Sequence, residues 1–125
     1  MGTMIAEGNQ KAFKSHFLAR IGNRVVFVET GEVVFFSAKN KIVYLHSVDG
    51  KRYIVKHTLE TLETILDPAQ FFRLNRSAIV QFSSIVQIRP HLNSRLKIYV
   101  RSGYDLHELI VSRERVGSLR KWVDR

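Results

Sequence analysis

The sequence predicts one mainly β domain with two or three short helices. Short runs of β-branched and aromatic residues recur along the chain, and Gly, Asn, Asp or Pro residues separate them. The run from Arg95 to Arg101 alternates apolar with polar or basic side chains, as a half-buried strand does. Helical spacing of apolar residues is confined to short stretches, and 125 residues suit a single domain.

The first half of the chain predicts five strands, because its apolar runs end at turn signals. These runs are residues 17–21, 25–29, 33–38, 42–48 and 52–56. Asp49-Gly50 predicts a hairpin between the last two, since both residues tolerate positive φ. The polar run Lys39-Asn40-Lys41 predicts a turn between the two runs that flank it.

The second half mixes helices and strands. Leu59, Leu62 and Leu66 recur at helical spacing after a capping Thr58, and Asp67-Pro68 ends that helix. Further strands are predicted over residues 85–89, 95–101 and 104–111. A last helix begins after Ser112 as N-cap and carries an apolar stripe of Val116, Leu119, Trp122 and Val123. The whole chain thus predicts about eight or nine strands.

The N-terminal segment lacks a clear hydrophobic period. Met1-Gly2-Thr3-Met4 resembles an expression scar ahead of a second start, and the residues up to Lys14 read as a linker between domains. We therefore expect residues 1–14 to be scar and linker, and residues 15–125 to form the domain.

The charge indicates a polyanionic partner. Twenty Lys and Arg oppose eleven Asp and Glu, which gives a net charge of +9. Residues 73–101 hold six basic and no acidic groups, whereas residues 58–72 hold three acidic and no basic ones. Such a surplus favours nucleic acid first and an anionic membrane surface second. The chain has no cysteine and no apolar run near the roughly 20 residues of a membrane span, so we expect a cytoplasmic protein without a membrane partner.

The sequence carries no pattern typical of catalysis. The five histidines form no HxxxH or HxH pair, and GxSxG, P-loop and GxGxxG motifs are absent from it. We therefore expect no catalytic residues, no metal site and no cofactor.

The segment from Phe71 to Val80 combines apolar ends with a polar centre. Phe71-Phe72 and Ile79-Val80 would anchor it, and the run between them contains Arg73, Asn75, Arg76 and Ser77. Anchored in this way, the run would present Arg and Asn outward. Arg can read guanine, Asn adenine, and Ser can bind a phosphate oxygen. An ordinary amphipathic turn with hydrated arginines explains the same pattern, and the residues alone leave both interpretations open.

The chain from about Phe17 to Val123 resembles the LytTR DNA-binding domain, the output module of LytR/AlgR-type bacterial response regulators. The resemblance is carried by residues 71–81 and supported by residues 34–41, 49–53, 58–63 and 111–113. Three positions depart from the family pattern: Asn75 stands where His is common, Gln81 where Asn is common, and Glu114 where Arg is common. We expect these changes to alter the DNA sequence that is bound.

The resemblance implies a fold, a function and a set of DNA contacts. The family fold is an elongated arrangement of three antiparallel sheets with a few short helices. Family members bind double-stranded DNA sequence-specifically, often as dimers on direct repeats, and they control transcription behind a receiver domain that would lie upstream of this chain. The implied DNA-binding residues are Lys39, Asn40, Lys41, Arg73, Asn75, Arg76, Ser77, Ser112, Arg113 and Arg115.

Two other functions fit the composition. A domain for RNA or single-stranded nucleic acid would stack bases on exposed aromatics, for which Tyr99 and Tyr104 are candidates. A protein-interaction domain would turn its basic face to an acidic partner or membrane surface, and it would show no preference for a DNA sequence.

Overall fold

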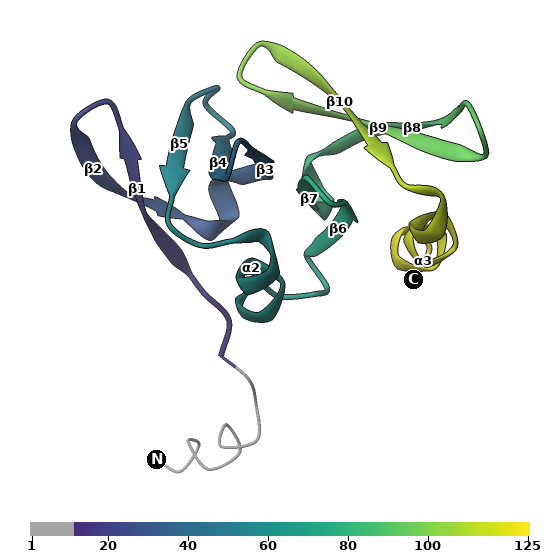
Figure 1. Ribbon diagram of the computed structural model, residues 1–125, viewed down its shortest axis with the longest axis horizontal. Helices are drawn as coiled ribbons and strands as arrows, with labels where there is room; N and C mark the ends of the chain where they lie inside the picture. Colours follow the sequence, from purple (N-terminus) through teal and green to yellow (C-terminus); the bar gives the residue numbers. More distant parts are fainter. Residues whose placement is uncertain (1–11) are drawn as a thin grey trace.

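The computed structural model describes residues 12–125, which form two antiparallel sheets and two α-helices (Figure 1). The strands and helices are β1 (His16–Ile21), β2 (Arg24–Glu29), β3 (Val33–Lys39), β4 (Ile42–Ser47), β5 (Arg52–Val55), α2 (Leu59–Ile65), β6 (Phe71–Asn75), β7 (Ala78–Gln81), β8 (Ile85–His91), β9 (Arg95–Ser102), β10 (Asp105–Val111) and α3 (Arg113–Val123). Short 3-10 turns lie at Thr30–Glu32 and Phe82–Ser84. The mainly β prediction is confirmed.

The expected three sheets are two in the structure. One has seven strands in the order β2-β1-β5-β4-β3-β7-β6, and the other has three in the order β10-β9-β8. The reason is that strands of different hairpins pair with each other at two places. Arg20 of β1 pairs with Ile54 of β5, and residues 35–37 of β3 pair with β7, so the hairpins join the central strands in one sheet.

Each face of β3 packs into a different core. On one face Phe36 packs with Phe17 and Leu45 under the helix residues Leu59 and Leu62. On the other face Phe35 packs with side chains of β7, β9 and α3, namely Val80, Ile98, Val100 and Leu119. The β3–β7 end of the large sheet therefore lies between α2 on one side and the small sheet with α3 on the other (Figure 1).

The two helices begin where the sequence predicts. Thr58 caps α2, because its hydroxyl oxygen accepts a hydrogen bond from the Thr61 amide at 3.1 Å. Ser112 occupies the N-cap position of α3, but its hydroxyl donates to the Leu74 carbonyl at 3.3 Å instead of capping the helix. The start of α3 is thereby tied to β6.

The turns β4–β5 and β9–β10 meet at one end of the molecule. The Gly103 amide donates to the Val48 carbonyl at 3.0 Å, and the Ser102 hydroxyl donates to the Ser47 carbonyl at 2.7 Å. A Cβ atom at Gly103 would lie 2.8 Å from the Gly50 Cα, which is closer than real contacts allow. Both glycines also have positive φ. The hairpin predicted at Asp49-Gly50 is confirmed, and this contact joins the two sheets.

The expected linker covers residues 1–14, of which residues 1–11 lie outside the described part. Lys14 is bound to the domain: its amide donates to the Ile65 carbonyl at 2.9 Å, and its carbonyl accepts from the Thr30 hydroxyl at 2.9 Å. Across residues 12–125, neither helix has the length and apolar character that a bilayer crossing needs.

Candidate nucleic-acid interface

The β3–β4 turn exposes the first group of candidate residues. Lys39 pairs with Ile42, so Asn40 and Lys41 alone form the turn, with φ values of 53° and 67°. Two-residue turns with both φ values positive match the twist of a hairpin. All three candidates, Lys39, Asn40 and Lys41, are exposed at this tip.

The β6–β7 turn lies beside it. The Ala38 amide at the end of β3 donates to the Ser77 carbonyl at 2.9 Å, and Ser37 pairs with Ala78. Arg76 and Ser77 are exposed. Hydrogen bonds between the strands thus hold two turns of the large sheet side by side, with candidate side chains facing solvent from each.

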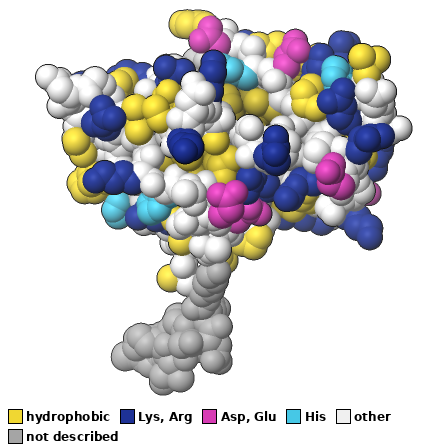
Figure 2. All heavy atoms as spheres, viewed as in Figure 1, with side chains coloured by type: hydrophobic (Ala, Val, Ile, Leu, Met, Phe, Trp, Pro, Cys, Tyr) yellow, Lys and Arg dark blue, Asp and Glu magenta, His cyan; other side chains and the backbone are white. Residues whose placement is uncertain are grey.

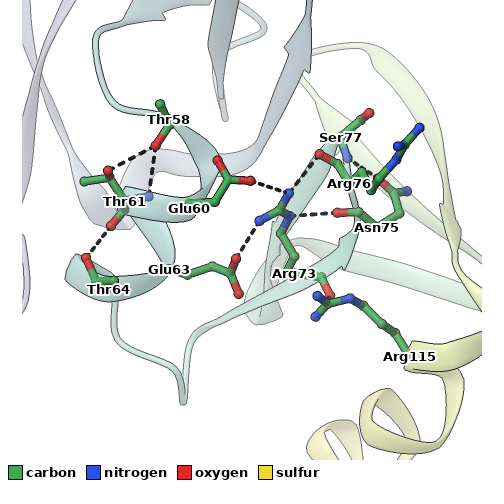
Figure 3. Close-up of polar contacts among 10 residues, drawn as sticks. All are labelled: Thr58, Glu60, Thr61, Glu63, Thr64, Arg73, Asn75, Arg76, Ser77 and Arg115. Carbon is green, nitrogen blue, oxygen red and sulfur yellow. Dashed lines mark hydrogen bonds and ion pairs between the residues drawn. The ribbon is translucent and has the colours of Figure 1, made fainter. Parts of the chain in front are cut away.

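Arg73 does not face outward as the sequence predicted, because the structure buries it to 9% exposure. Its guanidinium donates to the carbonyls of Asn75 at 2.7 Å and Arg76 at 2.9 Å, and it forms ion pairs with Glu60 and Glu63 of α2 (Figure 3). A hydrogen bond from its own backbone amide, and then the hydrogen bond from the Arg73 guanidinium, hold the pKa of the Glu60 carboxyl below its usual range. Arg73 therefore holds the β6–β7 turn in shape.

Asn75 is also bound within the protein. Its side-chain amide donates to the Ile110 carbonyl of β10, and its side-chain oxygen accepts from the Ser77 amide at 2.6 Å. The side chain is half-buried. It closes the turn and ties it to the small sheet, so Arg76 and Ser77 are the members of the predicted run that face out (Figure 3).

The start of α3 carries the third group of candidate residues and lies beside the β6–β7 turn. Arg113 is exposed, while the half-buried Arg115 donates to the Arg73 carbonyl at 3.3 Å. A depression of about 650 Å³ is lined by seven side chains besides Glu60: Arg73, Asn75, Arg76, Ser77, Ser112, Glu114 and Arg115. The structure therefore brings the second and third groups of candidates to one depression.

A second depression, of about 730 Å³, shares Asn75, Ser112 and Glu114 with the first and adds Arg113. Asn93 and Arg95 at the β8–β9 turn also line it, although neither is among the residues predicted from the sequence. A signal was present, since Arg95 belongs to the stretch of 29 residues without an acid. What the sequence could not show is that this turn lies next to α3.

The exposed cations of the site remain without acidic partners. Within residues 12–125, ion pairs join Arg73 to Glu60 and Glu63, and Lys97 to Glu108. None involves Lys39, Lys41, Arg76 or Arg113. Figure 2 shows Lys and Arg spread over one face of the molecule, with acidic side chains at few places. This arrangement leaves positive charge available to a phosphate backbone.

Exposed cations without ion pairs on three neighbouring segments are typical of a nucleic-acid-binding module. The model of the LytTr DNA-binding domain matches residues 23–124. The chain belongs to this family, and it is a DNA-binding domain of the kind found in regulators of transcription. The resemblance drawn from residues 71–81 is thereby confirmed.

The chain is also similar in sequence to curated regulatory and sensory transduction proteins. The chain is 27% identical over 115 residues to the sensory transduction protein LytT of Bacillus subtilis, covering 92% of this chain and 46% of the relative. It is 29% identical over 114 residues to the transcriptional regulatory protein BtsR of Escherichia coli K12, covering 90% and 44%. The chain thus spans less than half the length of these relatives. Its fold matches a LytTr DNA-binding domain of a response regulator from Bacillus cereus, with a TM-score of 0.80, 24% identity and coverage of 90% of this chain and 99% of the other.

Proposed function

We propose that this domain binds double-stranded DNA sequence-specifically, as the output domain of a two-component response regulator that controls transcription. The observation that carries the proposal is that the β6–β7 turn is hydrogen-bonded to the end of β3 and shares a depression with the start of α3. The β3–β4 turn, the β6–β7 turn and the start of α3 each carry an exposed cation that forms no ion pair within residues 12–125. Protruding turns fit the grooves of a duplex, whereas single-stranded binding depends on exposed aromatic platforms, which line neither depression.

The candidate residues divide into three sets. Exposed Lys39, Lys41 and Arg113 contact phosphates and supply affinity, while Asn40, Arg76 and Ser77 reach base edges or nearby phosphates and supply specificity. The remaining four have hydrogen bonds within the protein and position these contacts: Arg73, Asn75, Ser112 and Arg115.

The names of the relatives support a regulatory setting. In that setting the domain follows a receiver domain, acts in the cytoplasm, carries no catalytic activity and binds direct repeats as a dimer. Two copies on repeats one helical turn apart would face the same side of the duplex.

Selection of bound duplexes from a randomised pool at near-physiological salt tests this proposal. Enrichment of a motif repeated about one helical turn apart is the expected result. An unenriched pool whose binding vanishes with added salt would show generic attraction of polyanions and favour a protein-interaction domain. Competition by single-stranded DNA of the same sequence, equal to that by duplex, would favour the single-stranded alternative.

A further inference from the structure

Within the described residues 12–125, the large sheet has an exposed apolar region at its β2–β1 end. Directly paired residues point to the same side, and the register pairs Leu18 with Phe27 and Arg20 with Val25. Leu18, Val25 and Phe27 are 58%, 59% and 71% exposed. The small sheet covers this same face at the β3–β7 end and lies away from the β1–β2 hairpin (Figure 1). Large apolar side chains gathered on one surface mark a site of interaction.

A groove runs along this region where β1 and β5 separate. The two strands pair at one position, Arg20 with Ile54. Beside this pair lies a groove of about 390 Å³, whose apolar lining includes Leu18, Val25 and Ile54. Among residues 12–125, its polar lining consists of Lys14, Arg20, Lys56 and His57, with no Asp or Glu. Burial, with the nearby Lys14, lowers the pKa of His57, so its ring is mostly neutral at physiological pH.

We propose that this groove binds a peptide segment of a partner protein that combines acidic with apolar side chains. Leucine-like side chains of the segment would cover Leu18, Val25 and Ile54, and its carboxylates would meet the cations Lys14, Arg20 and Lys56. A second copy of the chain fits poorly here, because a symmetric contact would set these cations against each other. A concave groove also accepts a chain segment better than it accepts a flat lipid surface.

This site is separate from the candidate DNA interface. None of its lining residues contributes to the depressions around Arg76 and Arg113. Circular dichroism checks that variants of the groove are folded, so the groove proposal fails or survives independently of the proposed function.

Fluorescence anisotropy with three labelled decapeptides and the full chain tests the proposal. The probes alternate Glu with Leu, Lys with Leu, and Glu with Ser. We expect the Glu-Leu peptide to bind at least tenfold more tightly than the other two, because it alone supplies both the charge and the apolar side chains. Equal binding of the Glu-Leu and Glu-Ser peptides would reduce the interaction to generic charge attraction and overturn the proposal.

Variants locate the binding. Leu18→Ser and Lys56→Glu should each weaken binding of the Glu-Leu peptide at least fivefold while DNA binding is retained. The matched controls are Leu106→Ser, an exposed leucine of β10, and Lys121→Glu, an exposed lysine of α3. Both should bind the peptide as wild type does. Loss of the same size in the controls, or none in Leu18→Ser and Lys56→Glu, would contradict the proposal. If phosphatidylglycerol vesicles bind through Leu18 and the peptide does not bind, the surface takes lipid instead.

Discussion

Replacement of Arg73 by Met separates a positioning role from a direct DNA contact. Met keeps an apolar stem of similar length but removes the guanidinium, which leaves the carbonyls of Asn75 and Arg76 without their donors. Each hydrogen bond from a charged donor contributes about 1.5 kcal/mol or more, so the two together predict a loss of about 3 kcal/mol in the free energy of unfolding. Glu60 and Glu63, with side chains 76% and 41% exposed, remain hydrated and add little.

Urea denaturation followed by circular dichroism measures this loss, and a titration with the selected duplex measures DNA affinity. The matched variant is Arg76→Ala, which alters an exposed side chain of the same turn. It should change stability by less than about 0.5 kcal/mol. It should weaken DNA binding by about 1–3 kcal/mol and relax base preference. A stable Arg73→Met protein with strongly reduced DNA affinity would refute the reasoning, because Arg73 would then act on DNA itself.

Three further predictions concern single residues. Lys41→Ala should weaken binding to every duplex alike and lower the slope of log affinity against log salt by about 1, as measured by titration at several salt concentrations; an unchanged slope would remove Lys41 from the phosphate contacts. Burial, together with the electrostatic effect of the neighbouring His107 and Arg52, lowers the pKa of His46 to about 4, so the unfolded chain takes up a proton first as the pH falls. Between pH 6.5 and pH 4, the free energy of unfolding of the wild type should therefore fall by up to about 3 kcal/mol more than that of a His46→Gln variant. Denaturation curves at each pH that show the same fall for both proteins would contradict this. Gly103→Ala should lower the melting temperature more than Gly22→Ala does. Both glycines have positive φ, but only at Gly103 would the new Cβ atom lie within 4 Å of other backbone atoms. Equal shifts would show that the contact with Gly50 yields readily.

The sequence predicted most of the local elements, because alternation, turn residues and caps act over short distances, but it did not predict the strands β6 and β7. The strands before Lys56, the Thr58 cap and the Asp49-Gly50 hairpin all depend on neighbours in the chain. The number of sheets does not depend on chain neighbours alone, since a single pair between Arg20 and Ile54 decides whether the first hairpin joins the large sheet.

The candidate site shows the same limit. The sequence identified the polar run after Phe72 but could not show which of its side chains turn inward. Arg73 points inward, where it forms ion pairs with the carboxylates of α2 at positions 60 and 63. Asn75 points inward, where its side-chain amide donates to a carbonyl 35 residues further on. Both partners lie on other elements, so their effect becomes visible only once the strands are paired. Arg95 was missed for a related reason, because its closeness to α3 is a tertiary contact.

The division of the β6–β7 turn between inward and outward side chains has a consequence for how such a regulator diverges. Arg73 and Asn75 maintain the backbone, while Arg76 and Ser77 extend from it and support little of the fold. Under the proposed function, substitutions at the outward positions would therefore change the preferred operator at little cost in stability. After gene duplication, a copy could acquire a new set of promoters through one or two such changes, while the inward pair keeps the scaffold intact.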